Sequence, residues 1–366
     1  MLISLKKEEL NRCLDIVEKA LPTRSTMQSI ENILLEYDGN ELAFTATNLE
    51  LDIRVKIPYS GGAAGKILLP SKIVDIVRYL PSSDLEIEIN WGNLRIDLTS
   101  GQAKYNLFGA NPEDYPLVQA KMAENKVLTL DQSLLKAIIK SVVFAASTDE
   151  SRPAFNGVLF HFKNSGLTLN ASDTYRLVVK DMINESWLFE EQRYLIPAKA
   201  LRELLKILNE DGQVSIYPQQ KQVIFNFGDV YFATRVLEEK YPDVSGVIPT
   251  DYKTRVTMDR KLLEDTVGRA ALLAEGLNQA VHFSIQENQL EVKVSSPVGR
   301  MEEALQSQQE GEAVEVFVNS RFVIDILKVM EKKEVVIDFH GKNGPLVFRM
   351  PGDTGYLYLV LPIKME

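Results

Sequence analysis

The sequence has few residues of the kinds that usually carry redox, metal or membrane functions. Of its 366 residues, one is cysteine and three are histidine. Cys13 forms no disulfide within the chain, and its place in an apolar helical pattern predicts a small core residue. No apolar run approaches the roughly 18 residues of a membrane span. The start, MLISLKKEELNRC, lacks the layout of a secretory signal, so we expect a cytoplasmic protein.

The sequence also lacks the motifs of common enzymes and nucleotide-binding proteins. His161, His282 and His340 fall in alternating strand-like runs without a histidine at i+4 or a nearby cysteine, which predicts no metal site. The loop SGGAAGKI (60–67) fails the GxxxxGK[ST] pattern of a phosphate-binding loop at its first and last positions. No GxSxG, HExxH or Rossmann glycine pattern occurs. We therefore expect no catalytic residues, no cofactor and no metal.

A short amphipathic segment, by contrast, occurs three times. It reads LPSKIVDIVRYL from Leu69, IPAKALRELLKIL from Ile196 and VNSRFVIDILKVM from Val318. The copies begin 127 and 122 residues apart, which is too long a period for a solenoid. The spacing predicts three copies of one domain.

A second helical segment precedes each copy. Its apolar residues recur at i, i+4 and i+7, as at Leu10, Leu14 and Val17, which places them on one helical face. Asp131 and Asp259 stand at the N-cap positions of the second and third of these helices. The pattern predicts two helices in each repeat, each with one buried face.

Runs of alternating apolar and polar residues follow every helix. Turn sequences typical of hairpins separate them, namely DGN at 38–40, NSG at 164–166 and EN at 287–288. Such alternation predicts antiparallel sheets with one buried face, covered by the helices. We predict an α+β protein of three tandem domains, each a doubled helix-plus-antiparallel-sheet unit. Acid-bearing stretches with a Tyr-Pro step mark linkers, and the domains are expected at 1–121, 122–250 and 251–366.

Positive charge is concentrated on the predicted helices. The six predicted helices span 6–20, 71–80, 131–145, 198–208, 259–273 and 320–330. Together they carry a net charge of +5, whereas the whole chain carries −10. Bases off the apolar stripe of the second helices are Lys72, Arg78, Lys199, Arg202, Lys206, Arg321 and Lys328. A solvated face would explain any single helix. The same sign on four of six helices favours one shared surface that binds phosphates without reading sequence.

Over essentially its whole length the chain resembles the bacterial DNA polymerase III β subunit, the replicative sliding clamp. The motifs that carry the resemblance are ILLEYDGNELAFTATNLELDI, NPEDYPLV, FNGVLF, ASDTYRL, EEKYPDVSGVIP and YLVLPIKM. The resemblance implies a head-to-tail homodimer that closes into a ring, with helices lining a hole for double-stranded DNA and sheets forming the outer surface. Such a ring tethers the polymerase for processive synthesis and has no catalytic activity of its own.

The resemblance also implies which residues meet DNA and partner peptides. Arg24 and Arg152 match positions that approach DNA, and they join Lys72, Arg78, Lys199, Arg202 and Lys206 as candidate DNA-binding residues. A groove between the second and third domains is expected to take short peptide motifs from DNA polymerase III, the clamp loader and repair proteins. Its matching residues are Phe155, Ser172, Thr174, Tyr175, Arg176, Leu177, Pro242, Val247, Leu359, Leu361, Pro362 and Ile363. The family usually has Gly or Ser where this chain has Thr174, and His where it has Tyr175.

The dimer seam is expected to join the first domain of one chain to the third domain of the other. Tyr105 and Leu107 on an edge strand match one side of the seam, and Leu272 and Leu273 at the end of a helix match the other. The alternative is a clamp-related protein that binds partner peptides without encircling DNA. An enzyme would need a cleft of ionisable groups, which no residue spacing here predicts.

Overall fold

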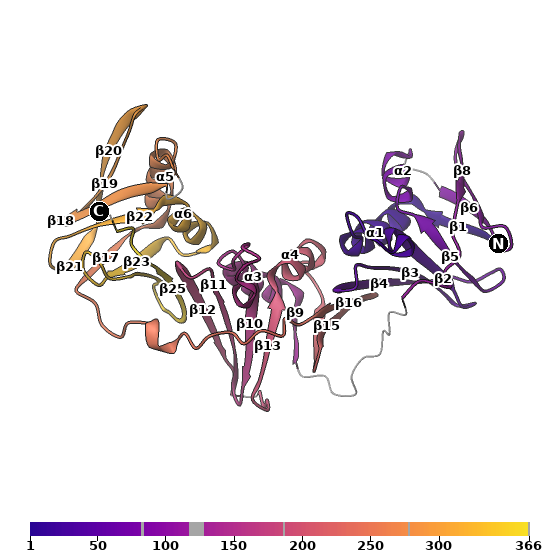
Figure 1. Cartoon of the computed structure of the whole chain (residues 1–366), viewed down its shortest axis with the longest axis horizontal. Coiled ribbons are helices and arrows are strands. Elements are labelled where there is room, and N and C mark those ends of the chain that lie inside the picture. Colours follow the sequence, from indigo (N-terminus) through magenta and orange to yellow (C-terminus); the bar gives the residue numbers. More distant parts are fainter. Residues whose placement is uncertain (82–83, 117–127, 186, 277–278, 365–366) are drawn as a thin grey trace. The chain divides into compact units, whose positions relative to one another are not determined.

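The structure is a computed structural model that describes residues 1–366 except 82–83, 117–127, 186, 277–278 and 365–366. The expected boundary at 121 and the tail residue Glu366 thus lie outside the described residues. Six α-helices form in the described part, each within a range predicted from the sequence (Figure 1). They are α1 (Lys7–Val17), α2 (Ile73–Tyr79), α3 (Gln132–Val143), α4 (Ala198–Ile207), α5 (Arg260–Ala271) and α6 (Ser320–Val329). Short 3₁₀ turns are η1 (Glu18–Ala20), η2 (Gln28–Glu31), η3 (Pro153–Phe155) and η4 (Ser245–Val247).

The predicted apolar helix faces are buried. In α1, Leu10, Leu14 and Val17 are fully covered together with Cys13. Burial raises the pKa of the Cys13 thiol to about 12, so this cysteine is a core residue, as predicted. Asp259 caps α5, because its carboxylate accepts a hydrogen bond of 2.9 Å from the Leu262 amide.

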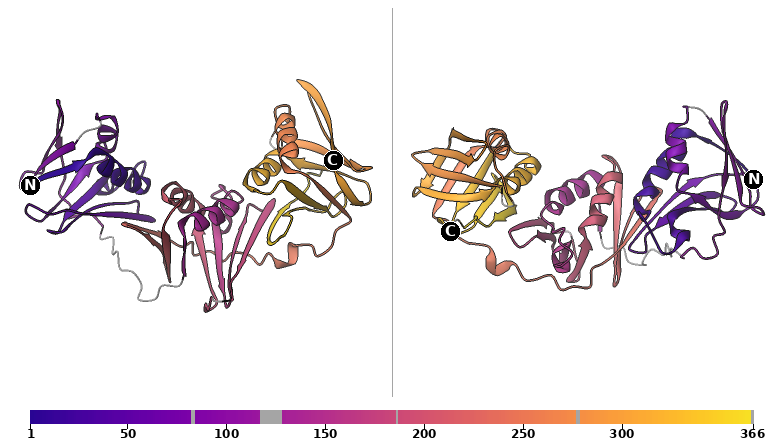
Figure 2. Two further views of the ribbon diagram at one scale, coloured as in Figure 1. Left: turned by 180° about the vertical axis from the view of Figure 1, so that it is seen from behind. Right: turned by 45° about the horizontal axis from the view of Figure 1, so that its top comes forward.

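Contacts divide the chain into two compact units that follow its sheets. One unit comprises Met1–Leu135 and Glu203–Val236, and the other comprises Lys136–Arg202 and Leu237–Glu366. The middle repeat therefore contributes strands to both units. Within each unit the helices lie to one side of the longer sheet (Figure 2), which matches the predicted arrangement of one-sided sheets covered by helices.

The first unit holds an eight-stranded and a four-stranded antiparallel sheet. The longer sheet has the order β5 (Gly65–Pro70), β2 (Asn32–Tyr37), β3 (Glu41–Thr47), β4 (Leu51–Pro58), β16 (Val230–Arg235), β15 (Gln222–Phe227), β14 (Gln213–Gln219) and β9 (Leu128–Asp131). The shorter sheet has the order β1 (Leu2–Lys6), β6 (Asp84–Asn90), β7 (Arg95–Ser100) and β8 (Ala103–Phe108).

The second unit holds a nine-stranded and a four-stranded sheet. The longer sheet has the order β13 (Gln192–Pro197), β10 (Gly157–Lys163), β11 (Gly166–Ser172), β12 (Arg176–Ile183), β25 (Asp353–Val360), β24 (Leu346–Met350), β23 (Glu334–Phe339), β17 (Thr254–Asp259) and β21 (Gln308–Gly311). The shorter sheet has the order β20 (Gly299–Gln306), β19 (Gln289–Ser296), β18 (Ala280–Gln286) and β22 (Val314–Asn319).

The predicted hairpin turns are confirmed in all three repeats. Residues 38–40 connect β2 to β3, and residues 164–165 connect β10 to β11. Glu287 and Asn288 connect β18 to β19 with φ of 53° and 63°. Two successive positive φ values belong to the type I′ turn that fits the twist of a hairpin.

Consecutive repeats are joined by pairing between their strands. β4 of the first repeat pairs with β16, the last strand of the second, and β12 of the second repeat pairs with β25, the last strand of the third. In the third repeat, β20 corresponds to β4 and β12. In the first repeat, β8 corresponds to β16 and β25. Each is an edge strand among the residues described for its sheet.

The chain returns to the sheet in the same way after the last strand of each repeat. The amide of Ala110 donates to the Leu68 carbonyl at 3.0 Å, that of Leu237 to Leu195 at 2.8 Å, and that of Ile363 to Phe317 at 2.7 Å. In the first two repeats a tyrosine then folds back onto the sheet, where Tyr115 is 6% exposed and Tyr241 is 7% exposed. The tyrosine of the Tyr-Pro step, which was predicted to lie in a linker, thus belongs in both cases to the core, whereas Pro116 is half-buried and Pro242 is exposed.

Candidate peptide groove, helix bases and edge strands

The turn between β11 and β12 is fixed by its own side chains. The Asp173 carboxylate accepts hydrogen bonds of 3.0 Å from the amides of Tyr175 and Arg176. The Ser172 hydroxyl donates to the Arg176 carbonyl at 2.7 Å. Ser172 is therefore buried and holds the turn rather than exposing its hydroxyl.

Thr174 sits at the strained position of this turn. Its φ of 80° lies in the left-handed region, which a β-branched residue rarely adopts. The Arg152 guanidinium donates to the Thr174 hydroxyl at 2.7 Å, and this contact ties the turn to η3. The position at which the family usually has Gly or Ser is thus one where the backbone itself favours glycine.

An apolar floor lies beside the turn. Leu177 packs with Val347, Leu357 and Leu359, and a neighbouring cluster joins Leu159, Leu195 and Tyr241 to Phe155. Val244, in the segment that leads to the third repeat, packs against both clusters. Val244 is not among the groove residues predicted from the sequence, because an isolated valine in an irregular segment gives no periodic pattern.

The rim of this floor exposes apolar side chains from three segments. Tyr175 is 57% exposed, Val247 is 60% exposed and Leu361 is 44% exposed, and Pro242 is exposed nearby. The Leu361 amide donates to the Tyr175 carbonyl at 2.9 Å, so the tail extends the β12–β25 pairing past the turn. Pro362 and Ile363 follow, half-buried. Together, the apolar floor and this exposed rim form the groove.

Arg176 lies in the wall of the groove and is engaged on every side. Its guanidinium pairs with Asp173 at 2.8 Å and with Asp325 of α6 at 2.7 Å, and it donates to the Phe144 carbonyl at 2.8 Å. It also stacks at 4.4 Å from the ring centroid of Phe322. The residue is 8% exposed, so it joins the second repeat to the third and shapes the wall from behind.

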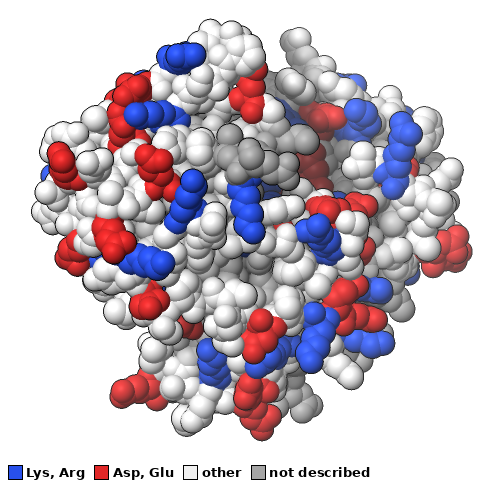
Figure 3. Space-filling model, turned by 60° about the vertical axis from the view of Figure 1, so that its left-hand side comes forward, with Lys and Arg blue, Asp and Glu red and all other residues white. Residues whose placement is uncertain are grey.

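Several helix bases have acidic neighbours. Lys72 pairs with Asp75 at 3.2 Å, and Lys206 pairs with Glu203 at 2.8 Å. Arg78 pairs with Asp15 at 2.7 Å and with Glu18 at 3.0 Å. Lys and Arg are likewise interspersed with Asp and Glu over the described part of the face in Figure 3. The free positive charge of the helices is therefore smaller than a count of residues gives.

The remaining candidate bases differ in exposure. Arg24 and Lys199 are exposed, the first in the loop between η1 and η2 and the second on α4. Arg202 is half-buried and donates to the Val143 carbonyl at 3.2 Å. Burial and the charge of Arg176 lower the pKa of Arg202. Lys199 is thus better placed than Arg202 to meet a phosphate.

The candidate seam residues lie on or beside the two edge strands. Tyr105, on β8, is 38% exposed, and Phe108 at the end of that strand is 81% exposed. Leu272, just after α5, is 83% exposed. A Cβ added to Gly299 of β20 would lie 3.9 Å from a Leu273 methyl, so Leu273 borders that edge. Large exposed apolar side chains beside an edge strand are typical of an interaction surface.

The described residues contain no group of three His, Cys, Asp or Glu side chains arranged to hold a metal. His161 and His282 lie in strands as predicted, whereas His340 lies just after β23, where its ring bonds backbone carbonyls of Pro345 and Asp251. No helix among the described residues is long and apolar enough to span a membrane.

Three tandem repeats, joined edge to edge by strand pairing and carrying helices on one side of their sheets, define a clamp-type α+β fold. Models of the DNA polymerase III beta subunit match the chain in order: the N-terminal domain at residues 1–119, the central domain at 129–243 and the C-terminal domain at 245–364. The beta sliding clamp of Staphylococcus aureus is 30% identical over 377 residues, covering 100% of this chain and 99% of that protein. That of Bacillus subtilis is 32% identical over 380 residues, covering both chains fully.

Solved structures agree with this family. The crystal structure of the Bacillus subtilis sliding clamp superposes with a TM-score of 0.94 at 30% identity, and a DNA polymerase III beta subunit from Eubacterium rectale with a TM-score of 0.93 at 27% identity. Each comparison covers 100% of both chains. The chain belongs to the DNA polymerase III beta subunit family, the bacterial sliding clamps.

Proposed function

We propose that two copies of this chain close head to tail into a ring that encircles double-stranded DNA and tethers DNA polymerase III. One observation carries the proposal. Two equivalent strand junctions, β4 with β16 and β12 with β25, form within the chain, whereas the strands equivalent to these, β20 and β8, are edges among the residues described for their sheets. Pairing β20 of one copy with β8 of another repeats the junctions already present. Both copies then contribute both edges, so two seams close a ring.

The internal junctions specify the register of this seam. The strands β4, β12 and β20 can be aligned with one another through their hairpin partners. Equivalent pairs in the three hairpins are Thr47 with Asp52, Ser172 with Leu177 and Ser295 with Arg300. Inside the chain, Phe232 then lies opposite Ile53, and Tyr358 lies opposite Val178. The equivalent pair at the seam is Tyr105 opposite Met301. Phe232 and Tyr358 are fully buried beside their junctions, and we expect Tyr105 to become more buried when the seam forms.

The same register gives the other exposed residues of β8 a partner. Lys104 falls opposite Glu302, whose side chain is 64% exposed, and the two charges are complementary. Phe108 falls opposite Val298, which is 68% exposed. Leu107 falls opposite Gly299, beside Leu273. An edge that brings apolar side chains together and pairs opposite charges is a surface suited to a second copy.

We propose further that the groove binds short apolar peptide segments of DNA polymerase III, the clamp loader and repair proteins. An apolar floor with exposed Tyr175, Val247 and Leu361 at its rim supports this role. The exposed bases, including Arg24, Arg152 and Lys199, are proposed to meet DNA phosphates weakly enough to allow sliding. On this proposal the protein is a cytoplasmic processivity factor without catalysis, with domains at 1–121, 122–250 and 251–366.

The seam is tested by placing a charge on its most exposed apolar residue. Phe108→Asp changes a side chain that is 81% exposed in the single chain, so the fold is expected to persist. We expect light scattering to show a dimer for the unaltered chain and a monomer for the variant at micromolar concentration. Ile183→Asp is the matched control, because Ile183 is also 81% exposed but lies at the end of β12, away from either edge.

The ring itself is tested on DNA of different topology. After loading by a clamp loader, the chain should stay on nicked circular DNA and leave when that DNA is cut. Phe108→Asp should abolish retention. A chain that remains monomeric, yet still binds polymerase peptides, would instead favour the alternative of a peptide-binding protein that does not encircle DNA.

A further inference from the structure

An equivalent spot on the sheet occurs in every repeat, opposite the helices. It is formed by a residue of the repeat's first hairpin strand and its neighbour on the strand before the second helix. The pairs are Leu34 with Leu68, Leu159 with Leu195, and His282 with Phe317. On the other side, Leu34, Leu159 and His282 pair with Thr45, Asn170 and Lys293 of the next hairpin strand. The three spots therefore occupy equivalent positions in their sheets.

The chain covers this spot in the first two repeats. Tyr115 packs with Leu68 and Leu34, and Tyr241 packs with Leu159 and Leu195. Each tyrosine follows the strand return described above, five residues after Ala110 and four residues after Leu237. Each also precedes a proline. The covering group is therefore the tyrosine of a Tyr-Pro step, on the segment that follows the strand return.

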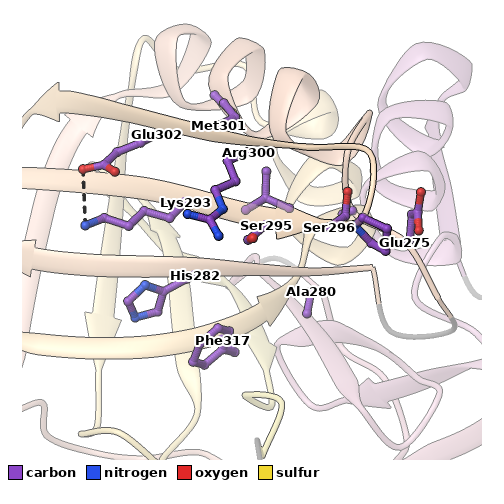
Figure 4. Close-up of a pocket in the computed structure, with 13 residues that line it drawn as sticks. Glu275, Ala280, His282, Lys293, Ser295, Ser296, Arg300, Met301, Glu302 and Phe317 are labelled. Carbon is purple, nitrogen blue, oxygen red and sulfur yellow. Dashed lines mark ion pairs between the residues drawn. The ribbon is translucent and has the colours of Figure 1, made fainter.

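Among the described residues, none covers the same spot in the third repeat. His282 and Phe317 stack there with ring centroids 4.6 Å apart and planes 25° apart. They line a cavity of about 680 Å³, and Figure 4 shows the two rings on neighbouring strands, with Arg300 directed towards them and Lys293 directed to Glu302. The strand return is present, through Ile363 and Phe317, but Lys364 is the one residue described beyond it and does not line the cavity.

Charged side chains of both signs line the cavity, namely Lys293, Arg300, Glu275 and Glu302, and Arg300 is the cation that a covering segment could pair with. Arg300 is exposed, and no ion pair to it is found among the described residues; the equivalent positions hold Asp52 and Leu177. In the segments that cover the other repeats, acidic residues precede the tyrosine, as in NPEDYP and EEKYP. Lys293 is the other cation, and it is paired with Glu291 at 2.6 Å and Glu302 at 3.4 Å.

We propose that this cavity is a second docking site, for a partner protein segment in which acidic residues precede a Tyr-Pro step. The tyrosine ring would lie on the His282–Phe317 pair as Tyr115 and Tyr241 lie on theirs, and the acids would face Arg300. The aromatic floor of the site lies on β18 and β22, whereas Arg300 lies on β20, the edge strand proposed to form the seam. The site is therefore distinct from the groove and borders the seam.

A single aromatic anchor limits the affinity. One ring buries roughly 150–250 Å², and most of the resulting free energy offsets the lost freedom of the peptide. We expect a dissociation constant on the order of 0.1–1 mM for the isolated segment. Such a contact acts as an auxiliary anchor for a partner that is already held elsewhere, since linking two weak contacts raises their joint affinity.

The test uses a peptide of this chain's own sequence, GANPEDYP (residues 109–116), added to the full-length protein and followed by NMR or fluorescence anisotropy. Phe317→Ala should weaken binding at least tenfold, and Arg300→Glu about threefold or more. Replacing the peptide tyrosine by alanine should abolish binding. Arg300 is exposed, so this variant remains informative if Phe317→Ala disturbs the fold.

Val247→Asp separates this site from the groove. If the proposal holds, it leaves binding of the Tyr-Pro peptide unchanged. Loss of binding in Val247→Asp would assign the peptide to the groove and overturn the proposal. Equal binding of the alanine peptide, or binding indifferent to both Phe317→Ala and Arg300→Glu, would overturn it as well.

Discussion

Arg176 is the residue whose replacement tests the junction between the second and third repeats most directly. In Arg176→Met, the carboxylates of Asp173 and Asp325 lose their partner and the Phe144 carbonyl loses a donor. Removing one member of a buried ion pair typically costs about 3–5 kcal/mol. Asp173 and Asp325 have side chains 16% and 27% exposed, so water relieves part of this cost. Methionine also keeps apolar contact with Phe322, and we expect a loss of about 3 kcal/mol.

This loss is measurable as a shift in thermal unfolding. The unit that contains Arg176 comprises Lys136–Arg202 and Leu237–Glu366, a size at which about 1 kcal/mol moves the midpoint by roughly 2–4 °C. The transition of this unit should therefore fall by about 6–12 °C. The two units are expected to give separate transitions if they unfold independently, so the scan reads each by itself.

Two further variants decide whether the paired charges cause the shift. Arg95→Met removes an exposed arginine that pairs with Asp97 at 2.9 Å, and it should leave the midpoint unchanged within error. Adding Asp325→Leu to Arg176→Met should recover part of the loss, because an apolar group replaces an unpaired charge. A shift for Arg176→Met as small as that of Arg95→Met would refute the reasoning.

Two other residues give further predictions. Thr174→Gly relieves a left-handed backbone and should raise the midpoint of the same unit by about 2–4 °C, whereas Thr148→Gly, in a nearby loop without positive φ, should not raise it. A fall in Thr174→Gly that exceeds the fall in Thr148→Gly would show that the Arg152 contact outweighs the strain. Lys199→Glu should shorten the half-life of the loaded ring on circular DNA and make that half-life less sensitive to salt, whereas Lys163→Glu, at a hairpin turn, should change neither; equal half-lives at low salt would remove Lys199 from the DNA surface.

The helices and hairpins were predictable because their patterns are local. The i, i+4, i+7 spacing of Leu10, Leu14 and Val17 and the turn residues 287–288 depend on neighbours in sequence, and the structure confirms both. The repeat of one segment near Leu69, Ile196 and Val318 extended these local patterns to the domain level. This is why all six helices fall within their expected ranges.

Contacts between distant segments were less predictable. Val244 packs on two clusters, and Arg176 lies between Phe144 and Phe322. Nothing in the sequence near these residues indicates such partners, which are distant in sequence and in part belong to the next repeat. The Tyr-Pro steps illustrate the same limit, since proline and acids predicted a linker while Tyr115 and Tyr241 are buried. Their recurrence at nearly the same distance after the last strand of two repeats was the pattern that could have revealed them.

The strand junctions also decide where such a ring would open. β4 and β16, like β12 and β25, belong to one continuous chain, so a pair that separates is held nearby at an effective concentration of about a millimolar or more. β8 and β20 of different copies have no such tether. Dilution weakens their pairing alone, and each separation there competes with diffusion of a whole subunit. A ring of this kind that is loaded onto DNA without free ends would therefore open where β8 of one copy meets β20 of the other, because only these paired strands belong to different chains.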